Sequence, residues 1–159
     1  MSEARALALL IVEDEALIRR SIRLAVERAG HVVRGTDATV AEAIDLVTRF
    51  AHEIDAAILD LNLRGDLSPP VAEALRDAGI PTLVLTGYSE DDARDAGMTA
   101  PVLHKPFRAH DPIEALDAVV ADRGRHLCRH ASAGETACAT LATRPMTGPG
   151  RCGQEGSAG

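Results

Sequence analysis

Several residue types are scarce or absent in this 159-residue sequence, and each absence excludes a class of function. The chain has no tryptophan, two phenylalanines and one tyrosine, too few aromatic side chains for a surface that stacks nucleic-acid bases. The longest apolar run, residues 6–12, is far too short to span a bilayer, and it is too short for a signal peptide. We therefore expect a cytoplasmic protein that binds neither nucleic acid nor membrane.

Positive charge is also scarce, and almost all of it is arginine. Residues 1–122 carry 12 Arg and Lys against 22 Asp and Glu, a formal charge of −10, which argues against a DNA-binding surface. Lys105 is the only lysine among 17 cationic side chains. A lysine kept at one place raises the question of what an ammonium group does there that a guanidinium could not.

The composition changes after residue 122. Residues 1–122 have ample apolar side chains for a core and contain no cysteine, so no disulfide framework supports that part. Residues 123–159 are rich in Ala, Gly, Thr and Pro, carry a formal charge of +3 and hold all three cysteines, Cys128, Cys138 and Cys152. Such a segment buries too little to offset its ordering entropy. We expect one folded domain over 1–122 and a disordered tail over 123–159.

Within the first 122 residues, apolar runs alternate with amphipathic stretches. Continuous apolar runs are typical of strands buried on both faces, and apolar stripes at helical spacing mark the helices. Such alternation favours a doubly wound α/β fold with a parallel sheet covered on both sides. Strands are expected at residues 7–12, 31–34, 56–61, 81–86 and 101–104, and helices at 15–29, 40–51, 68–79, 89–97 and 110–122.

Residues whose side chains could bind a metal ion or take part in catalysis follow four of the five predicted strands. In an open parallel sheet, ligands bind beyond the carboxyl ends of the strands. Three carboxylates so close repel one another unless a cation lies among them, and oxygen ligands without His or Cys favour Mg²⁺. Carboxylates, a divalent ion, a lysine and a hydroxyl together suit phosphoryl transfer. The residues at this edge are Glu13, Asp14, Asp60, Thr86 and Lys105.

Four motifs around these residues carry a family resemblance. The stretches LLIVEDEALIR, AAILDLNLRGD, LVLTGY and VLHKPF, in this order, resemble the receiver domain of two-component response regulators. The resemblance covers residues 7–122 and implies a flavodoxin-like sheet of strand order 2-1-3-4-5. It points more narrowly to stand-alone receivers of alphaproteobacterial type, although Val84 and Leu85 replace the Phe-Ala usual there.

The resemblance assigns roles around the phosphoryl acceptor. Asp60 resembles the acceptor itself, and Glu13 and Asp14 resemble the acidic pair that holds Mg²⁺ with it. Asn62 has the place at which a backbone carbonyl binds the metal. The implied function is a single-domain response regulator that takes a phosphoryl group from a histidine kinase or histidine phosphotransfer protein. It would signal to a downstream protein through a changed surface, and it would not be a metabolic enzyme.

The resemblance also assigns a conformational switch. Thr86 resembles the switch hydroxyl, and Lys105 the lysine that pairs with the phosphoryl group, followed by a cis Lys-Pro bond. A compact ammonium fits such a crowded site, where a planar guanidinium would not. Most receivers with this switch carry an aromatic three residues before the lysine, but here that residue is Val102. Tyr88 is the only candidate substitute.

Three alternatives remain. A pseudo-receiver would act by binding alone. A phosphatase of the haloacid dehalogenase type also uses an Asp nucleophile. Enzymes of that type carry an Asp-x-Asp motif after the first strand, whereas Asp60 and Asn62 follow the third strand here. A flavodoxin-like binder of flavin mononucleotide would need a glycine- and hydroxyl-rich loop after the first strand, and the acidic residues 13–15 would repel its phosphate.

Overall fold

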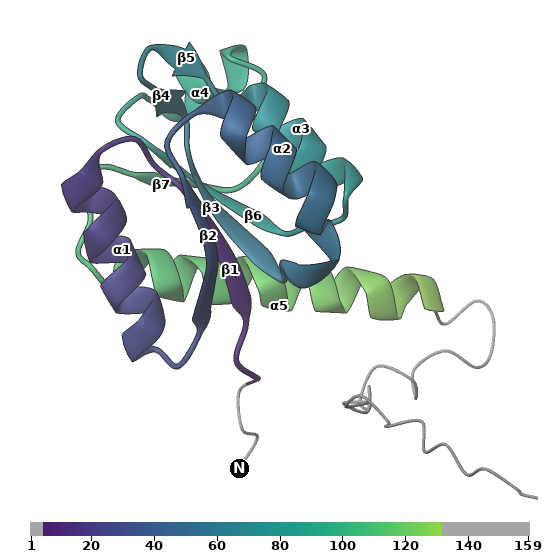
Figure 1. The fold of residues 1–159 in the computed structure, drawn as a ribbon. Helices are drawn as coiled ribbons and strands as arrows, with labels where there is room; N and C mark the ends of the chain where they lie inside the picture. Colours follow the sequence, from purple (N-terminus) through teal and green to yellow (C-terminus); the bar gives the residue numbers. More distant parts are fainter. Residues whose placement is uncertain (1–4, 132–159) are drawn as a thin grey trace, which may run out of the picture. The chain divides into compact units, whose positions relative to one another are not determined.

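The computed structural model describes residues 5–131 of the chain, with side chains through residue 123. A five-stranded parallel sheet of order β2-β1-β3-β6-β7 forms its centre (Figure 1). This is the predicted order 2-1-3-4-5, because β6 and β7 are the fourth and fifth strands of the sheet. Its strands are β2 (Val32–Asp37), β1 (Ala8–Val12), β3 (Ala56–Asp60), β6 (Thr82–Thr86) and β7 (Val102–His104).

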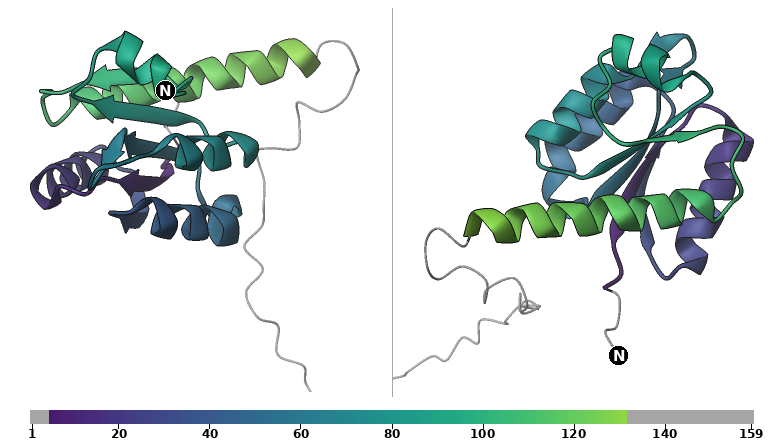
Figure 2. Two further views of the ribbon diagram at one scale, coloured as in Figure 1. Left: turned by 90° about the horizontal axis from the view of Figure 1, so that it is seen from above. Right: turned by 180° about the vertical axis from the view of Figure 1, so that it is seen from behind.

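Helices cover both faces of the sheet and enclose separate cores. Two helices, α1 (Ala16–Arg28) and the first part of α5 (Asp111–Ala131), lie on one face, and α2 (Val40–Phe50) and α3 (Pro69–Asp77) lie on the other (Figures 1 and 2). Alternation along the strands decides which core a residue enters. In β6, Leu83 and Leu85 join the core beneath α1 and α5. Between them, Val84 points the other way, into a smaller cluster with α4 (Glu90–Asp95).

The second strand extends further than its apolar residues predicted. We expected residues 31–34, but β2 continues through Gly35 and Thr36 to Asp37, paired parallel with β1 after a shift in register at Arg34. These residues are typical of turns, and the strand lies at the exposed edge of the sheet, so no apolar pattern marks it. A Cβ on Gly35 would lie 2.6 Å from Leu46 Cδ1, so the glycine allows α2 to pack closely here.

A short hairpin after β3 was not predicted. Strands β4 (Asn62–Leu63) and β5 (Asp66–Leu67) pair antiparallel around a two-residue turn. Both turn residues have positive φ, 57° at Arg64 and 97° at Gly65, which is the backbone of a type I′ hairpin turn. A 3-10 turn, η1 (Ala51–Glu53), follows α2 and was likewise not predicted.

The last helix is longer than the sequence pattern indicated. We expected it to end near residue 122, but α5 continues to Ala131, so the first nine residues of the predicted tail are helical. The rest of that tail, residues 132–159, lies outside the described residues. None of the helices in the described part of the chain is long and apolar enough to cross a membrane.

Candidate functional site

The carboxyl ends of the strands gather five predicted residues at one edge of the sheet. Glu13 and Asp14 follow β1, Asp60 ends β3, Thr86 ends β6, and Lys105 follows β7. Parallel strands place their carboxyl ends together, so residues up to 92 positions apart in the chain meet here.

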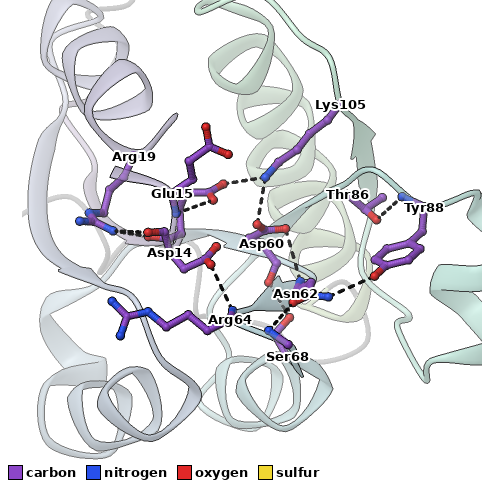
Figure 3. A network of polar contacts seen from close by, with 12 residues as sticks. Asp14, Glu15, Arg19, Asp60, Asn62, Arg64, Ser68, Thr86, Tyr88 and Lys105 are labelled. Carbon is purple, nitrogen blue, oxygen red and sulfur yellow. Dashed lines mark hydrogen bonds and ion pairs between the residues drawn. The ribbon is translucent and has the colours of Figure 1, made fainter. Parts of the chain in front are cut away.

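Lys105 connects two of the carboxylates. Its Nζ donates to Glu13 Oε2 and to Asp60 Oδ2, at 2.9 Å in each case (Figure 3). The side chains of Glu13, Asp60 and Lys105 are 1%, 9% and 22% exposed. Charge-assisted hydrogen bonds are stronger in such a poorly solvated place than at the surface. One ammonium therefore holds acids from two different strands in a fixed relation.

Burial and charge shift the protonation of this pair. Burial raises the pKa of Glu13 to about 7, and the Asp60 charge raises it too, while the Lys105 hydrogen bond opposes both. Burial lowers the pKa of Lys105, but its hydrogen bonds to Asp60 and Glu13 outweigh burial and leave that pKa raised. The ammonium is therefore charged at neutral pH, and Glu13 exchanges a proton near neutrality.

Three carboxylates form a compact group of oxygen ligands. Glu13, Asp14 and Asp60 each offer an oxygen, and these oxygens lie within 4.8 Å of one another. A single lysine faces two of these acids. The donor set is hard, anionic and free of sulfur and imidazole, which fits Mg²⁺ better than a transition metal. The residues present therefore suit the ion that the resemblance implies.

Backbone amides hold the same carboxylates. Glu13 Oε1 accepts from the Glu15 N–H at 3.1 Å, and Asp14 Oδ2 accepts from the Arg64 N–H at 3.1 Å. The left-handed backbone at Arg64 thus brings the unpredicted hairpin against the predicted acidic pair. Asp60 Oδ1 lies 3.4 Å from the Asn62 N–H.

Hydrogen bonds link Asn62, Tyr88 and Thr86 in a bridge on the other side of Asp60 (Figure 3). Asn62 Nδ2 donates to Tyr88 Oη at 3.1 Å, and the Tyr88 N–H donates to Thr86 Oγ1 at 2.9 Å. Asn62 Oδ1 also accepts from the Gly65 N–H at 2.8 Å. Thr86 is fully buried and Tyr88 is 45% exposed, so a buried hydroxyl is linked to the backbone of a surface tyrosine.

Val102, the third predicted switch residue, lies away from this bridge. It is half-buried on β7 and packs against the small cluster that contains Val84, Ala93 and Met98. The Lys105–Pro106 peptide bond is cis, as the resemblance implied.

Two further contacts at the site were not predicted. Fully buried Ser68 donates from Oγ to the Asp60 carbonyl at 2.6 Å; its place before Pro69 indicated only a helix start. Arg19 Nη1 donates to the Glu13 carbonyl at 2.5 Å and lies 3.4 Å from the Asp14 carbonyl. Its spacing along α1, six residues after Glu13, was the only signal in the sequence.

The fold, together with the acidic and hydroxyl side chains at one edge of its sheet, indicates the class of protein. A family model described as "Response regulator receiver domain" matches residues 9–117, and the chain belongs to this family. Among curated relatives, it is 35% identical over 117 residues to the Mycobacterium tuberculosis "Transcriptional regulatory protein PdtaR", covering 70% of this chain and 56% of that protein. It is 32% identical to the Pseudomonas aeruginosa "Two-component response regulator PhoP", covering 70% and 51%.

Solved structures also resemble this chain, and the matches cover nearly the whole length of those structures. The solution structure of SdrG from Sphingomonas melonis Fr1 is 42% identical, with a TM-score of 0.61, and the match covers 72% of this chain and 97% of that one. A receiver from Sinorhizobium medicae has the same fold at 23% identity and a TM-score of 0.66, covering 74% and 97%. In contrast, the chain spans about half the length of the curated relatives it matches.

Proposed function

We propose that this receiver accepts a phosphoryl group on Asp60 from a phosphohistidine donor, and that the reaction needs Mg²⁺. The observation that carries the proposal is the buried arrangement of Asp60 and Glu13 around one ammonium, with Asp14 completing a group of oxygens within 4.8 Å. The donor would be a histidine kinase or a histidine phosphotransfer protein. The chain's own activity would be limited to its phosphorylation and dephosphorylation.

The transfer forms one bond and breaks one. An Asp60 carboxylate oxygen attacks phosphorus, the P–O bond forms as the P–N bond of phosphohistidine breaks, and the departing imidazole nitrogen takes a proton from solvent. Bound among Glu13, Asp14 and Asp60, Mg²⁺ would supply charge neutralisation for the phosphoryl oxygens. Lys105 Nζ lies 2.9 Å from Asp60 Oδ2, close enough to pair with the new phosphoryl group once the carboxylate has been phosphorylated.

Movement of the Thr86 hydroxyl would be the first step of the conformational signal. Its Oγ1 now accepts from the Tyr88 N–H, so a hydroxyl that turns toward a phosphoryl group must give up that bond. Tyr88 Oη also accepts from Asn62, which ties the same loop to the residue two positions after Asp60. Tyr88 can therefore report the state of Asp60 at the surface without an aromatic at position 102.

The output would be protein contact through α4, β7 and the adjoining part of α5. A hollow on this face is lined by Glu90, Ala93, Met98 and Val102, among others. Mapping NMR shifts with and without beryllofluoride tests this part of the proposal. Shifts confined to the loop around Asp60 would refute a surface signal.

The phosphatase alternative lacks support at position 62. That reaction needs an acid two residues after the nucleophile, and the side chain there is an amide whose two ends bond Gly65 and Tyr88. A pseudo-receiver that acts by binding alone remains the alternative, and it predicts no covalent product.

The test is mass spectrometry after incubation with acetyl phosphate or a phosphohistidine donor in Mg²⁺. Wild-type protein should gain one phosphoryl group that mild base removes. Asp60→Asn should abolish the product, whereas Asp66→Asn, an exposed carboxylate on the neighbouring hairpin, should keep it. Wild-type protein that stays unmodified with both donors would refute the proposal, as would a product that forms equally well in EDTA.

A further inference from the structure

Arg19 contacts the loop that carries two of the three clustered carboxylates. It reaches back from α1, and its Nη1 donates to the Glu13 carbonyl at 2.5 Å and lies 3.4 Å from the Asp14 carbonyl (Figure 3). We propose that Arg19 is a positioning residue that orients Glu13 and Asp14 for the metal ion. The inference rests on the proposed function, because it concerns the Mg²⁺ site of that same reaction.

The loop needs a donor at this place. Residues 13–15 turn the chain from β1 into α1, and the helix begins without a side-chain cap at Glu15. A partly buried carbonyl without a partner is costly. The Glu13 N–H is already bonded to the Asp37 carbonyl at 3.0 Å. The Arg19 guanidinium holds the next peptide unit, between Glu13 and Asp14. Both peptide units that flank the Glu13 Cα are therefore fixed, and they set the directions in which the Glu13 and Asp14 side chains leave the loop.

The contacts of Arg19 differ from those of its neighbours on α1. Arg23 pairs with the Glu27 carboxylate at 2.9 Å on the exposed surface, and Arg20 is exposed. Arg19 is half-buried, and its hydrogen bonds, among the described residues, go to backbone carbonyls. A guanidinium aimed at neutral carbonyls acts through its donors and its planar shape more than through its charge.

Charge and position make opposite predictions for metal affinity. Arg19 is a cation close to a cation site, so its removal should strengthen Mg²⁺ binding if only charge matters. If Arg19 holds the loop, its removal should weaken binding, because residues that orient metal ligands typically contribute 10–100-fold to affinity or activity. The sign of the change therefore separates the two roles.

The experiment compares Mg²⁺ affinity in wild type, Arg19→Ala and Arg20→Ala, using NMR titration of the apo protein with MgCl₂. Arg19→Ala should bind Mg²⁺ about tenfold more weakly. Arg20→Ala removes the same charge one residue away without touching the loop, so it should change affinity by less than about twofold, toward tighter binding. Arg19→Lys keeps the charge and one donor group, and should recover part of the loss.

Three results would overturn the inference. Arg19→Ala that binds Mg²⁺ as tightly as wild type, or more tightly as in Arg20→Ala, shows that the loop does not depend on Arg19. Wild-type protein that binds no Mg²⁺ refutes the proposed metal site and this inference with it, and that failure is visible before any variant is made. If Arg19→Ala unfolds, Arg19→Lys takes its place in the test. The inference is then overturned if the amide resonances of Glu13 and Asp14 shift in Arg19→Lys, which shows a displaced loop, but its Mg²⁺ affinity equals that of wild type.

Discussion

Replacing Lys105 with methionine tests how much of the site depends on one ammonium group. The side chain keeps a similar length, but Glu13 and Asp60, 1% and 9% exposed, would lose the cation between them. Removing one partner of a buried ion pair costs about 3–5 kcal/mol. Lys105 is itself 22% exposed and Glu13 can take up a proton, so the lower end applies. We expect a loss of about 3 kcal/mol in unfolding free energy at about pH 8.

The loss should depend on pH with a defined sign. Burial already raises the pKa of Glu13 from 4.5 to about 7, with the Asp60 charge adding to burial and the Lys105 hydrogen bond opposing it. Without Lys105 that pKa rises further. A carboxyl group with a raised pKa binds more protons in the folded state, so stability falls as pH rises from 4.5 through the folded pKa. At about pH 6 a protonated Glu13 can donate to Asp60, and the loss should shrink by about 1 kcal/mol, to roughly 2 kcal/mol.

Urea unfolding followed by far-UV circular dichroism measures both values, with EDTA and with excess Mg²⁺. The proposed metal site exists only in the folded state, so Mg²⁺ should return part of the stability. Arg23→Met is the matched control: its pair with Glu27 has the same 2.9 Å distance, but the side chains are 55% and 44% exposed. It should cost less than about 0.5 kcal/mol at either pH. Equal losses of unfolding free energy in the two variants would refute the reasoning, as would a loss in Lys105→Met that is the same at both pH values.

Two further predictions concern stability away from Lys105. Burial raises the pKa of Asp37, with Glu42 and Asp45 adding to it, and its buried Oδ2 has no partner within the described part of the chain. Asp37→Asn should therefore raise the melting temperature at neutral pH, with a gain that vanishes as pH falls toward 3.8; a gain that persists in acid would contradict this. Gly30 ends α1 at φ 84° with nothing within 4 Å of a Cβ, so Gly30→Ala should cost about 1 kcal/mol in urea unfolding through backbone strain alone, and an unchanged midpoint would contradict it.

The parts of the fold that the sequence predicted are those where burial decides the residue type. Strands β3 and β6 are buried at every position, and a strand buried on both faces reads as a continuous apolar run. The end of β2 did not follow this rule, because an edge strand has little to bury and its residues 35–37 are indistinguishable from a turn. The hairpin at 62–67 escaped prediction for a related reason. Its strands have two residues each, too few for any period.

The site divides along the same line. Glu13, Asp60, Thr86 and Lys105 could be placed together because strand ends in a parallel sheet meet at one edge, and that follows from topology alone. Contacts from side chains on other helices and loops could not be predicted from the sequence. The reach of Arg19 back to two carbonyls depends on its rotamer and on the turn at residues 13–15. The bond between Asn62 and Tyr88 depends likewise on the short β4–β5 hairpin and on the loop after β6, and no sequence periodicity predicts the conformation of either.

The single lysine of this arginine-rich chain lies where one nitrogen serves two carboxylates. Lys105 Nζ is 2.9 Å from an oxygen of Glu13 and 2.9 Å from an oxygen of Asp60, and these acids follow different strands. An ammonium can direct its three protons to acceptors on different sides. A guanidinium is flat, and its donors lie in one plane that suits a single carboxylate approached edge-on. The geometry of two converging acids therefore favours a lysine here, while the exposed cations of α1, which meet one acid or none, can be arginine.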